Sequence, residues 1–119
     1  MSSPYTPFVA GAFVPLGNTV TFLANTAAPT AVQAPQGLAN NVSFCQYRIF
    51  NSGQNLIFLG VGANATTANN NAVVVTTTAN TIPVLPGSLE IISFPVNSYF
   101  TGITSSGNSQ IYVTPGLGM

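Results

Sequence analysis

Only three side chains in this 119-residue chain carry a charge or a thiol: Arg48, Glu90 and Cys45. Charged residues make up 2% of the chain, where about 25% is usual for a soluble domain. The chain contains no histidine, lysine or aspartate. A metal site needs several such ligands, a carboxylate pair needs a second carboxylate, and a nucleophilic serine or threonine needs a base. We therefore expect no enzymatic activity, no catalytic residue, no metal and no cofactor.

The same composition limits the partners. One arginine cannot neutralise a phosphate track, so we expect no nucleic-acid binding. The longest apolar stretch near the N-terminus, residues 8–16, is shorter than the roughly 20 residues of a membrane span. No basic segment followed by an apolar run resembles a signal peptide, so we expect synthesis in the cytoplasm and no membrane partner. The formal net charge of +0 leaves no self-repulsion between copies, which favours a homo-oligomer or a larger assembly.

The two charges and the thiol lie in segments that read as strands. Cys45 has no second cysteine to pair with, and we expect a buried, unreactive thiol. Arg48 and Glu90 can pair across a sheet or remain in water. Alternatively, the five donors of Arg48 can bind a partner's carbonyl or carboxylate groups.

The strand pattern predicts an all-β fold. Aromatic and β-branched runs separated by turn residues recur every 8–12 residues, which is typical of a sandwich or barrel, and no segment has helical periodicity. We expect a small antiparallel β-sandwich resembling a jelly roll. The predicted elements are a hairpin of strands 42–50 and 56–59, an exposed loop at 62–72, strands 73–78, 81–85 and 89–94, a type II turn at Pro86-Gly87, and a final hairpin of strands 99–104 and 110–114.

The first 41 residues differ in composition from the rest. They hold five of the nine prolines and one clear strand, residues 19–23. We interpret residues 1–41 as an extended, proline-stiffened arm, and residues 42–119 as the sandwich core of one domain overall. The arm can lie along its own domain or along a neighbour. The alternative is that this segment supplies one or two further strands of the same sandwich.

Three segments resemble small head proteins of tailed bacteriophages: YRIFNSGQNLIFLG at 47–60, IPVLPGSLEII at 82–92 and GNSQIYVTPG at 107–116. The resemblance covers residues 42–118 and implies a capsid decoration or cement protein. Such a protein sits on the outer surface of the virion capsid, and its partner is the major capsid protein, whose subunits it bridges. No catalytic or ligand-binding residues are implied.

The candidate partner contacts are the aromatic residues Tyr5, Phe8 and Phe13, together with Arg48. The aromatic residues can instead fill the domain's own core. A function from another class is a carbohydrate- or host-surface-binding module, such as a head fibre or an adhesin. Asparagine, glutamine and tyrosine can bind sugars without formal charges.

Overall fold

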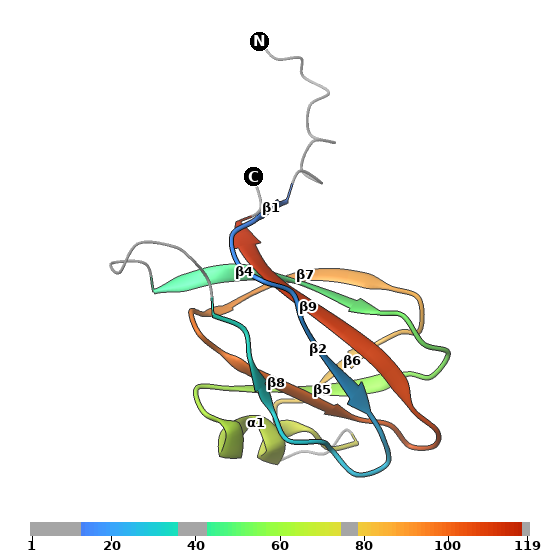
Figure 1. The fold of residues 1–119 in the computed structure, drawn as a ribbon. Coiled ribbons are helices and arrows are strands. Elements are labelled where there is room, and N and C mark those ends of the chain that lie inside the picture. The colour runs from blue at the N-terminus through green and yellow to red at the C-terminus, as the bar shows by residue number, and fades with distance from the viewer. Residues whose placement is uncertain (1–12, 36–42, 75–78, 118–119) are drawn as a thin grey trace.

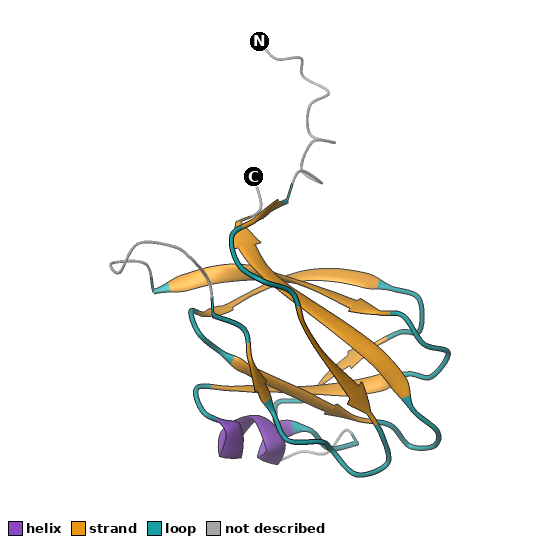
Figure 2. Ribbon diagram, in the orientation of Figure 1, coloured by secondary structure: helices purple, strands orange, loops and turns teal. Residues whose placement is uncertain are grey.

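The computed structural model describes residues 13–35, 43–74 and 79–117. Two antiparallel sheets pack face to face, and a short helix lies against the outside of one of them (Figure 1). Strands dominate the described residues (Figure 2). The expected antiparallel β-sandwich is confirmed, whereas its likeness to a jelly roll stays a prediction. The elements are β1 (Val14–Pro15), β2 (Val20–Ala24), β3 (Val32–Gln33), β4 (Phe44–Asn51), β5 (Ile57–Gly62), α1 (Ala65–Asn71), β6 (Ile82–Val84), β7 (Leu89–Pro95), β8 (Tyr99–Ile103) and β9 (Ser109–Leu117).

Each sheet has a simple order. Sheet A runs β1-β9-β4-β7, and β2 also pairs with β9. Sheet B runs β3-β8-β5-β6. The two long central strands of sheet A, β4 and β9, pair from Gln46 opposite Gly116 to Asn51 opposite Ile111. Strand β7 lies on the other side of β4, at the edge of the sheet.

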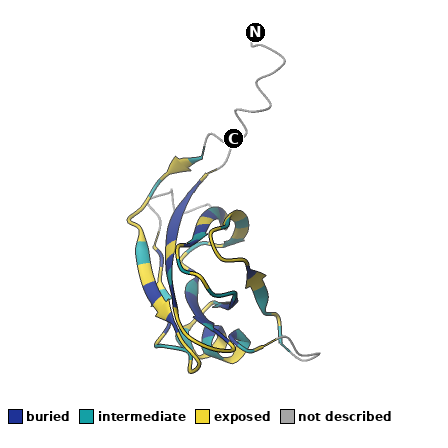
Figure 3. Cartoon of the chain, turned by 90° about the vertical axis from the view of Figure 1, so that its right-hand side faces the viewer, coloured by how far each residue is buried: buried dark blue, intermediate teal, exposed yellow. Residues whose placement is uncertain are grey.

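The core lies between the two sheets because apolar residues alternate along the strands. In β4, Cys45, Tyr47 and Ile49 are buried, while Phe44 and Arg48 are exposed. This period of two follows from the pleat, which points successive side chains to opposite faces. Figure 3 shows buried and exposed residues alternating along some strands, whereas others, such as β5 and β9, are buried over most of their length. The expectation that Cys45 is buried is confirmed.

An aromatic cluster fills the centre of the core. The ring of Tyr47 lies 4.8 Å from the ring of Phe100 and 6.0 Å from that of Phe94, centroid to centroid. The Tyr47 hydroxyl donates a hydrogen bond to the carbonyl oxygen of Pro95 at 3.0 Å. Tyr47 is fully buried, and burial raises the pKa of its hydroxyl well above the usual value.

We expect the buried Tyr47 hydroxyl to make the protein sensitive to alkali. An unfolded tyrosine ionises near pH 10, whereas the raised pKa keeps Tyr47 neutral in the folded chain. Its contribution to stability is therefore complete below about pH 10 and is lost as pH rises toward the folded pKa, at about 1.4 kcal/mol per pH unit. With one acidic side chain and no histidine, the melting temperature should change little between about pH 3 and 8.

Melting curves followed by circular dichroism from acid to alkaline pH measure this dependence. In Tyr47→Phe the melting temperature should fall less steeply above about pH 10 than in the unmodified chain. The variant also loses about 1 kcal/mol of hydrogen bonding at neutral pH. Tyr112→Phe, whose side chain is exposed, is the matched control and should keep the alkaline slope of the unmodified chain. Equal slopes in both variants would contradict the assignment to Tyr47.

Both predicted hairpins are wrong in their pairing. The turn after β4 leads into β5, but β4 belongs to sheet A and β5 to sheet B. The same holds for β8, in sheet B, and β9, in sheet A. Turn residues reverse the chain direction, but they do not determine whether the returning strand pairs with the previous one or crosses to the opposite sheet. In this fold both reversals cross.

The predicted loop at 62–72 is also wrong, because α1 lies within it. The side chain of Asn64 caps the helix by accepting a hydrogen bond from the Thr67 backbone N–H at 2.8 Å. Of the predicted strand 73–78, only Val73 and Val74 are described, and neither is in a strand. Residues 75–78 lie outside the described part of the chain. The strands predicted at 81–85 and 89–94 correspond to β6 and β7. The positive φ of 75° at Gly87 suits the turn predicted there.

The segment interpreted as an arm contributes to the sandwich wherever it is described. Strand β2 pairs with β9, and β3 pairs with β8. The side chain of Phe22 is buried in the core. Residue 42 is therefore not a boundary between an arm and a core, and residues 13–35 supply further strands of the same sandwich. The rest of the predicted arm, residues 1–12 and 36–41, lies outside the described residues.

Candidate functional site

The outer face of sheet A, which points away from sheet B, carries a broad group of exposed apolar side chains. Tyr112, Phe50 and Leu89 are level with one another across β9, β4 and β7. Arg48 and Ile91 occupy the next outward row. The exposed large apolar residues of this outer face are Leu23, Phe44, Leu89, Ile91 and Tyr112, and the exposed Arg48, Thr21, Ser93 and Pro95 lie on the same face. Large exposed apolar patches are uncommon on monomeric soluble domains, so the gathering of five such side chains on one face indicates a binding interface.

Arg48 lies in the middle of this outer face, on the central strand β4. Its guanidinium is 5.6 Å from the centroid of the Phe13 ring, within the range of a cation–π contact. The Phe13 ring lies over Gly116, where an added Cβ atom would be 2.6 Å from the ring's Cζ atom. A glycine at position 116 therefore leaves room for the ring to sit beside the arginine.

Two of the four predicted contact residues are thus brought together. Phe13 and Arg48 meet on the outer face of sheet A, so Phe13 does not fill the core between the sheets. Tyr5 and Phe8 lie outside the described residues. The other exposed residues of the outer face were missed, although a signal was present. In residues 42–50 and 89–94, apolar residues occur at both odd-numbered and even-numbered positions. Because successive side chains of a strand point to opposite faces, one of these apolar sets had to face outward.

The possible salt bridge between Arg48 and Glu90 does not form. Arg48 is directly opposite Ile91 on β7, so these two side chains share the outer face. Glu90 precedes Ile91 and therefore points to the other face of the sheet. Both charged residues are exposed, and no ion pair joins them in the described structure. Of the alternatives for Arg48, intramolecular pairing is thus wrong, while contact with water or with a partner remains.

The outer face of sheet B, by contrast, is covered. Helix α1 lies against β5 so closely that a Cβ atom on Gly60 would be 2.8 Å from the Cβ of Ala72 (Figure 1). The side chains of Asn69 and Thr101 both donate hydrogen bonds to the carbonyl oxygen of Pro29, at 3.1 and 2.8 Å. These contacts hold the segment before β3 over the same side. Of the two outer faces, that of sheet A is therefore the one that the described chain leaves uncovered.

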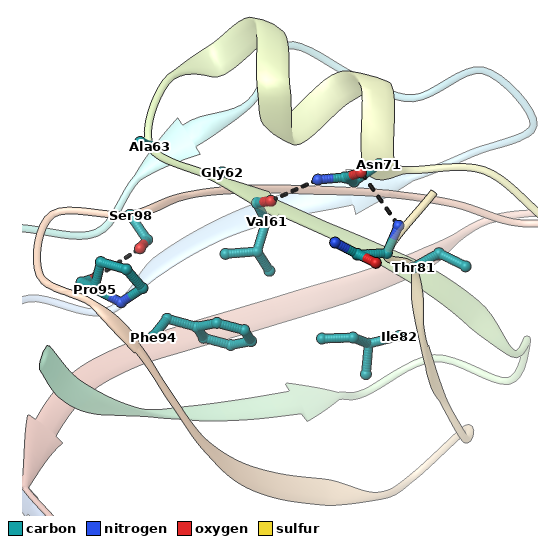
Figure 4. Close-up of a pocket in the computed structure, with 10 residues that line it drawn as sticks. Val61, Gly62, Ala63, Asn71, Thr81, Ile82, Phe94, Pro95 and Ser98 are labelled. Atoms are coloured by element: carbon teal, nitrogen blue, oxygen red, sulfur yellow. Dashed lines mark hydrogen bonds between the residues drawn. The ribbon is translucent and has the colours of Figure 1, made fainter. Parts of the chain in front are cut away.

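A cleft of about 410 Å³ opens between the sheets, beside the ends of β5 and β7 (Figure 4). Its apolar walls come from Val61, Ile82 and Phe94, and no charged side chain lines it. The Asn71 side chain donates to the Val61 carbonyl oxygen at 3.1 Å and accepts from the Asn80 backbone N–H at 3.3 Å.

These bonds weaken the case for a sugar site in the cleft. The Ser98 hydroxyl there is likewise engaged, because it donates to the Pro95 carbonyl oxygen at 2.6 Å. A sugar site needs polar groups that converge on the ligand, and Asn71 and Ser98 already use theirs within the chain. The outer face of sheet A is therefore the stronger candidate.

Comparison with known proteins adds no identification, because no family model, curated protein or solved structure matches this chain. Among the described residues, no helix is both long and apolar enough to cross a membrane.

Proposed function

We propose that this chain is a structural protein that binds a protein lattice through the outer face of sheet A. The lattice is the outer surface of a tailed-phage capsid, where the chain bridges major capsid subunits and stabilises the shell. The observation that carries the proposal is the gathering of five exposed large apolar side chains on the sheet face that the described residues leave uncovered. The resemblance of three sequence segments to phage head proteins supports the choice of lattice.

Binding on this face depends on apolar area more than on charge. Each Å² of apolar surface removed from water contributes about 25 cal/mol, before the cost of ordering the partners. Arg48 lies among these apolar groups, and arginine is a residue type that often dominates interface energetics. A lattice repeats the same contact many times, so a chain that touches two subunits gains avidity from a modest affinity at each.

Substitution of Phe44, the most exposed apolar residue of the outer face at 58%, tests this proposal. The probe is capsids purified without the chain from the virus whose genome encodes it, and binding is measured by co-sedimentation. Phe44→Ser should weaken binding by about tenfold or more, the effect expected for an anchor residue at an interface. The folded chain should keep its melting temperature, because the side chain packs little within the molecule.

Leu85→Ser is the matched control. Leu85 is 64% exposed, but it lies in the connection between β6 and β7 and is not part of sheet A. It should bind as the unmodified chain does. Binding should also persist at about 1 M NaCl, where screening limits charge interactions to about 3 Å. Equal binding by the two serine variants, or release by salt alone, would contradict the proposal.

A further inference from the structure

Strand β7 is an edge strand with an unused hydrogen-bonding side. It pairs with β4 over its whole length, and no other strand in the described part of the chain pairs with it. Its seven residues include the exposed Leu89 and Ile91. An edge strand of this kind presents unpaired N–H and C=O groups and is a template for a further strand.

The residues that face the open side can be identified from the ladder between β4 and β7. The backbone N–H of Asn51 donates to the Ser88 carbonyl oxygen at 3.1 Å, and that of Val96 donates to the Ser43 carbonyl oxygen at 3.0 Å. Hydrogen bonds in an antiparallel ladder involve every second residue of a strand. Even-numbered residues from 88 to 96 therefore face β4, and odd-numbered residues face the open side.

Three of these odd-numbered residues have backbone groups that no other described residue pairs with: Leu89, Ile91 and Ser93. Pro95 has no N–H, and its carbonyl oxygen already accepts hydrogen bonds from the hydroxyls of Tyr47 and Ser98. The open array is therefore symmetric about Ile91. A second copy, related by a two-fold axis through this position, places its Ser93 opposite Leu89 and its Ile91 opposite Ile91. Every free N–H and C=O of the array then has a partner.

The side chains permit this arrangement. The two Ile91 side chains meet on the outer face, and Glu90 lies opposite Ile92 of the second copy, so no like charges face each other. The two Arg48 side chains are three strand spacings apart, about 14 Å. That separation exceeds the screening length of about 8 Å at physiological ionic strength.

We propose that two copies of this chain pair along β7, in a two-fold symmetric dimer with one continuous sheet centred on Ile91. The outer faces of the two copies become neighbours in this dimer and form one larger apolar surface. The dimer does not depend on the proposed binding to a capsid, because its interface is the edge of sheet A rather than its face.

Sedimentation velocity on the full chain is the first test. The unmodified chain should sediment at twice the monomer mass of 12.2 kDa. Ile91→Lys and Ile91→Glu should each dissociate at least about tenfold more readily, because they place like charges opposite each other. An equal mixture of the two variants should recover the dimer. An unmodified chain that stays monomeric, or a mixture that dissociates as its components do, would overturn the proposal.

Cysteine cross-linking tests the register. Paired residues in a ladder have Cα atoms about 5.5 Å apart, a separation that a disulfide can span. Ile91→Cys should therefore give a disulfide-linked dimer under mild oxidation. Leu89→Cys is the control, since its own counterpart in the second copy lies four residues along the strand, about 13 Å away. The native Cys45 is buried in both variants. Equal cross-linking of the two variants would show that Ile91 is not at the axis.

Discussion

Asn51→Ala should cost this protein about 4 kcal/mol of its free energy of unfolding, which is a large part of the 5–15 kcal/mol typical of a domain. The side chain of Asn51 is fully buried. Its Nδ2 group donates to the carbonyl oxygens of Asn55 and Val84, at 2.9 and 3.1 Å. Its Oδ1 atom accepts from the Gly53 N–H at 3.1 Å and from the Ser109 hydroxyl at 2.6 Å.

These four hydrogen bonds join both sheets and the crossing between them. Val84 ends β6 in sheet B, Ser109 begins β9 in sheet A, and Gly53 lies in the crossing between the sheets. Alanine would leave the buried Val84 carbonyl oxygen and Ser109 hydroxyl, and the partly buried N–H of Gly53, without these partners. Each unpaired buried group costs about 1–3 kcal/mol, whereas a hydrogen bond exposed to water is readily replaced.

Denaturant unfolding of Asn51→Ala and of Asn55→Ala measures the difference. The side chain of Asn55 donates to the Asn108 carbonyl oxygen at 2.8 Å in an exposed position. Its loss should cost about 1 kcal/mol or less, because water can replace it. A difference between the two variants of less than about 1 kcal/mol would contradict the role assigned to Asn51.

The sequence indicated the strands of this fold better than the way they connect. The aromatic and β-branched run at 42–50 predicts β4 because its propensity is local. The pairing of β4 with β7 and β9, by contrast, brings together residues more than 35 positions apart. Turn residues at 51–54 carry no information about that choice. Hairpins were therefore predicted where the chain instead crosses between sheets.

The candidate site could be predicted only in part, again because it depends on how distant strands pair. Arg48 and Phe13 were singled out by residue type, as the only cation and as an aromatic residue in a proline-rich segment. Their meeting depends on the pairing of β1 with β9 and on the absence of a side chain at Gly116. The face on which Arg48 lies could not be read from β4 alone. Both alternating sets of that strand contain large apolar residues, and only the packing of sheet B selects the buried set.

Helix α1 illustrates a different limit. Its seven residues, ATTANNN, have no apolar periodicity and no strong helix formers beyond alanine. A helix this short is not stable alone, so its formation depends on tertiary contacts. Two glycines in β5, Gly60 and Gly62, provide those contacts by letting the helix backbone approach the sheet. The sequence shows the glycines, but their purpose appears only when the helix lies against them.

Gly60→Ala should therefore displace α1 from sheet B and destabilise the protein by about 3 kcal/mol. A Cβ atom at Gly60 would collide with the carbonyl oxygen of Ala68 and lie 2.5 Å from the backbone nitrogen of Ala72. These are backbone atoms of the helix and of its C-terminal cap, so no change of side-chain rotamer relieves the clash. The helix has to move as a unit, which exposes the buried Ala68 and the outer face of β5.

Gly102→Ala is the matched control, because it makes the same substitution in β8, the strand that pairs with β5. A Cβ atom there would lie 3.1 Å from a ring carbon of Phe22, whose side chain can shift by a few tenths of an ångström. The smaller entropy of the unfolded alanine chain offsets part of that cost, so stability should change by less than about 1 kcal/mol. Thermal unfolding of both variants measures the difference, and hydrogen exchange of the α1 amides should rise in Gly60→Ala alone. If α1 keeps its protection in Gly60→Ala, the close approach of helix and sheet is not what keeps the outer face of sheet B covered.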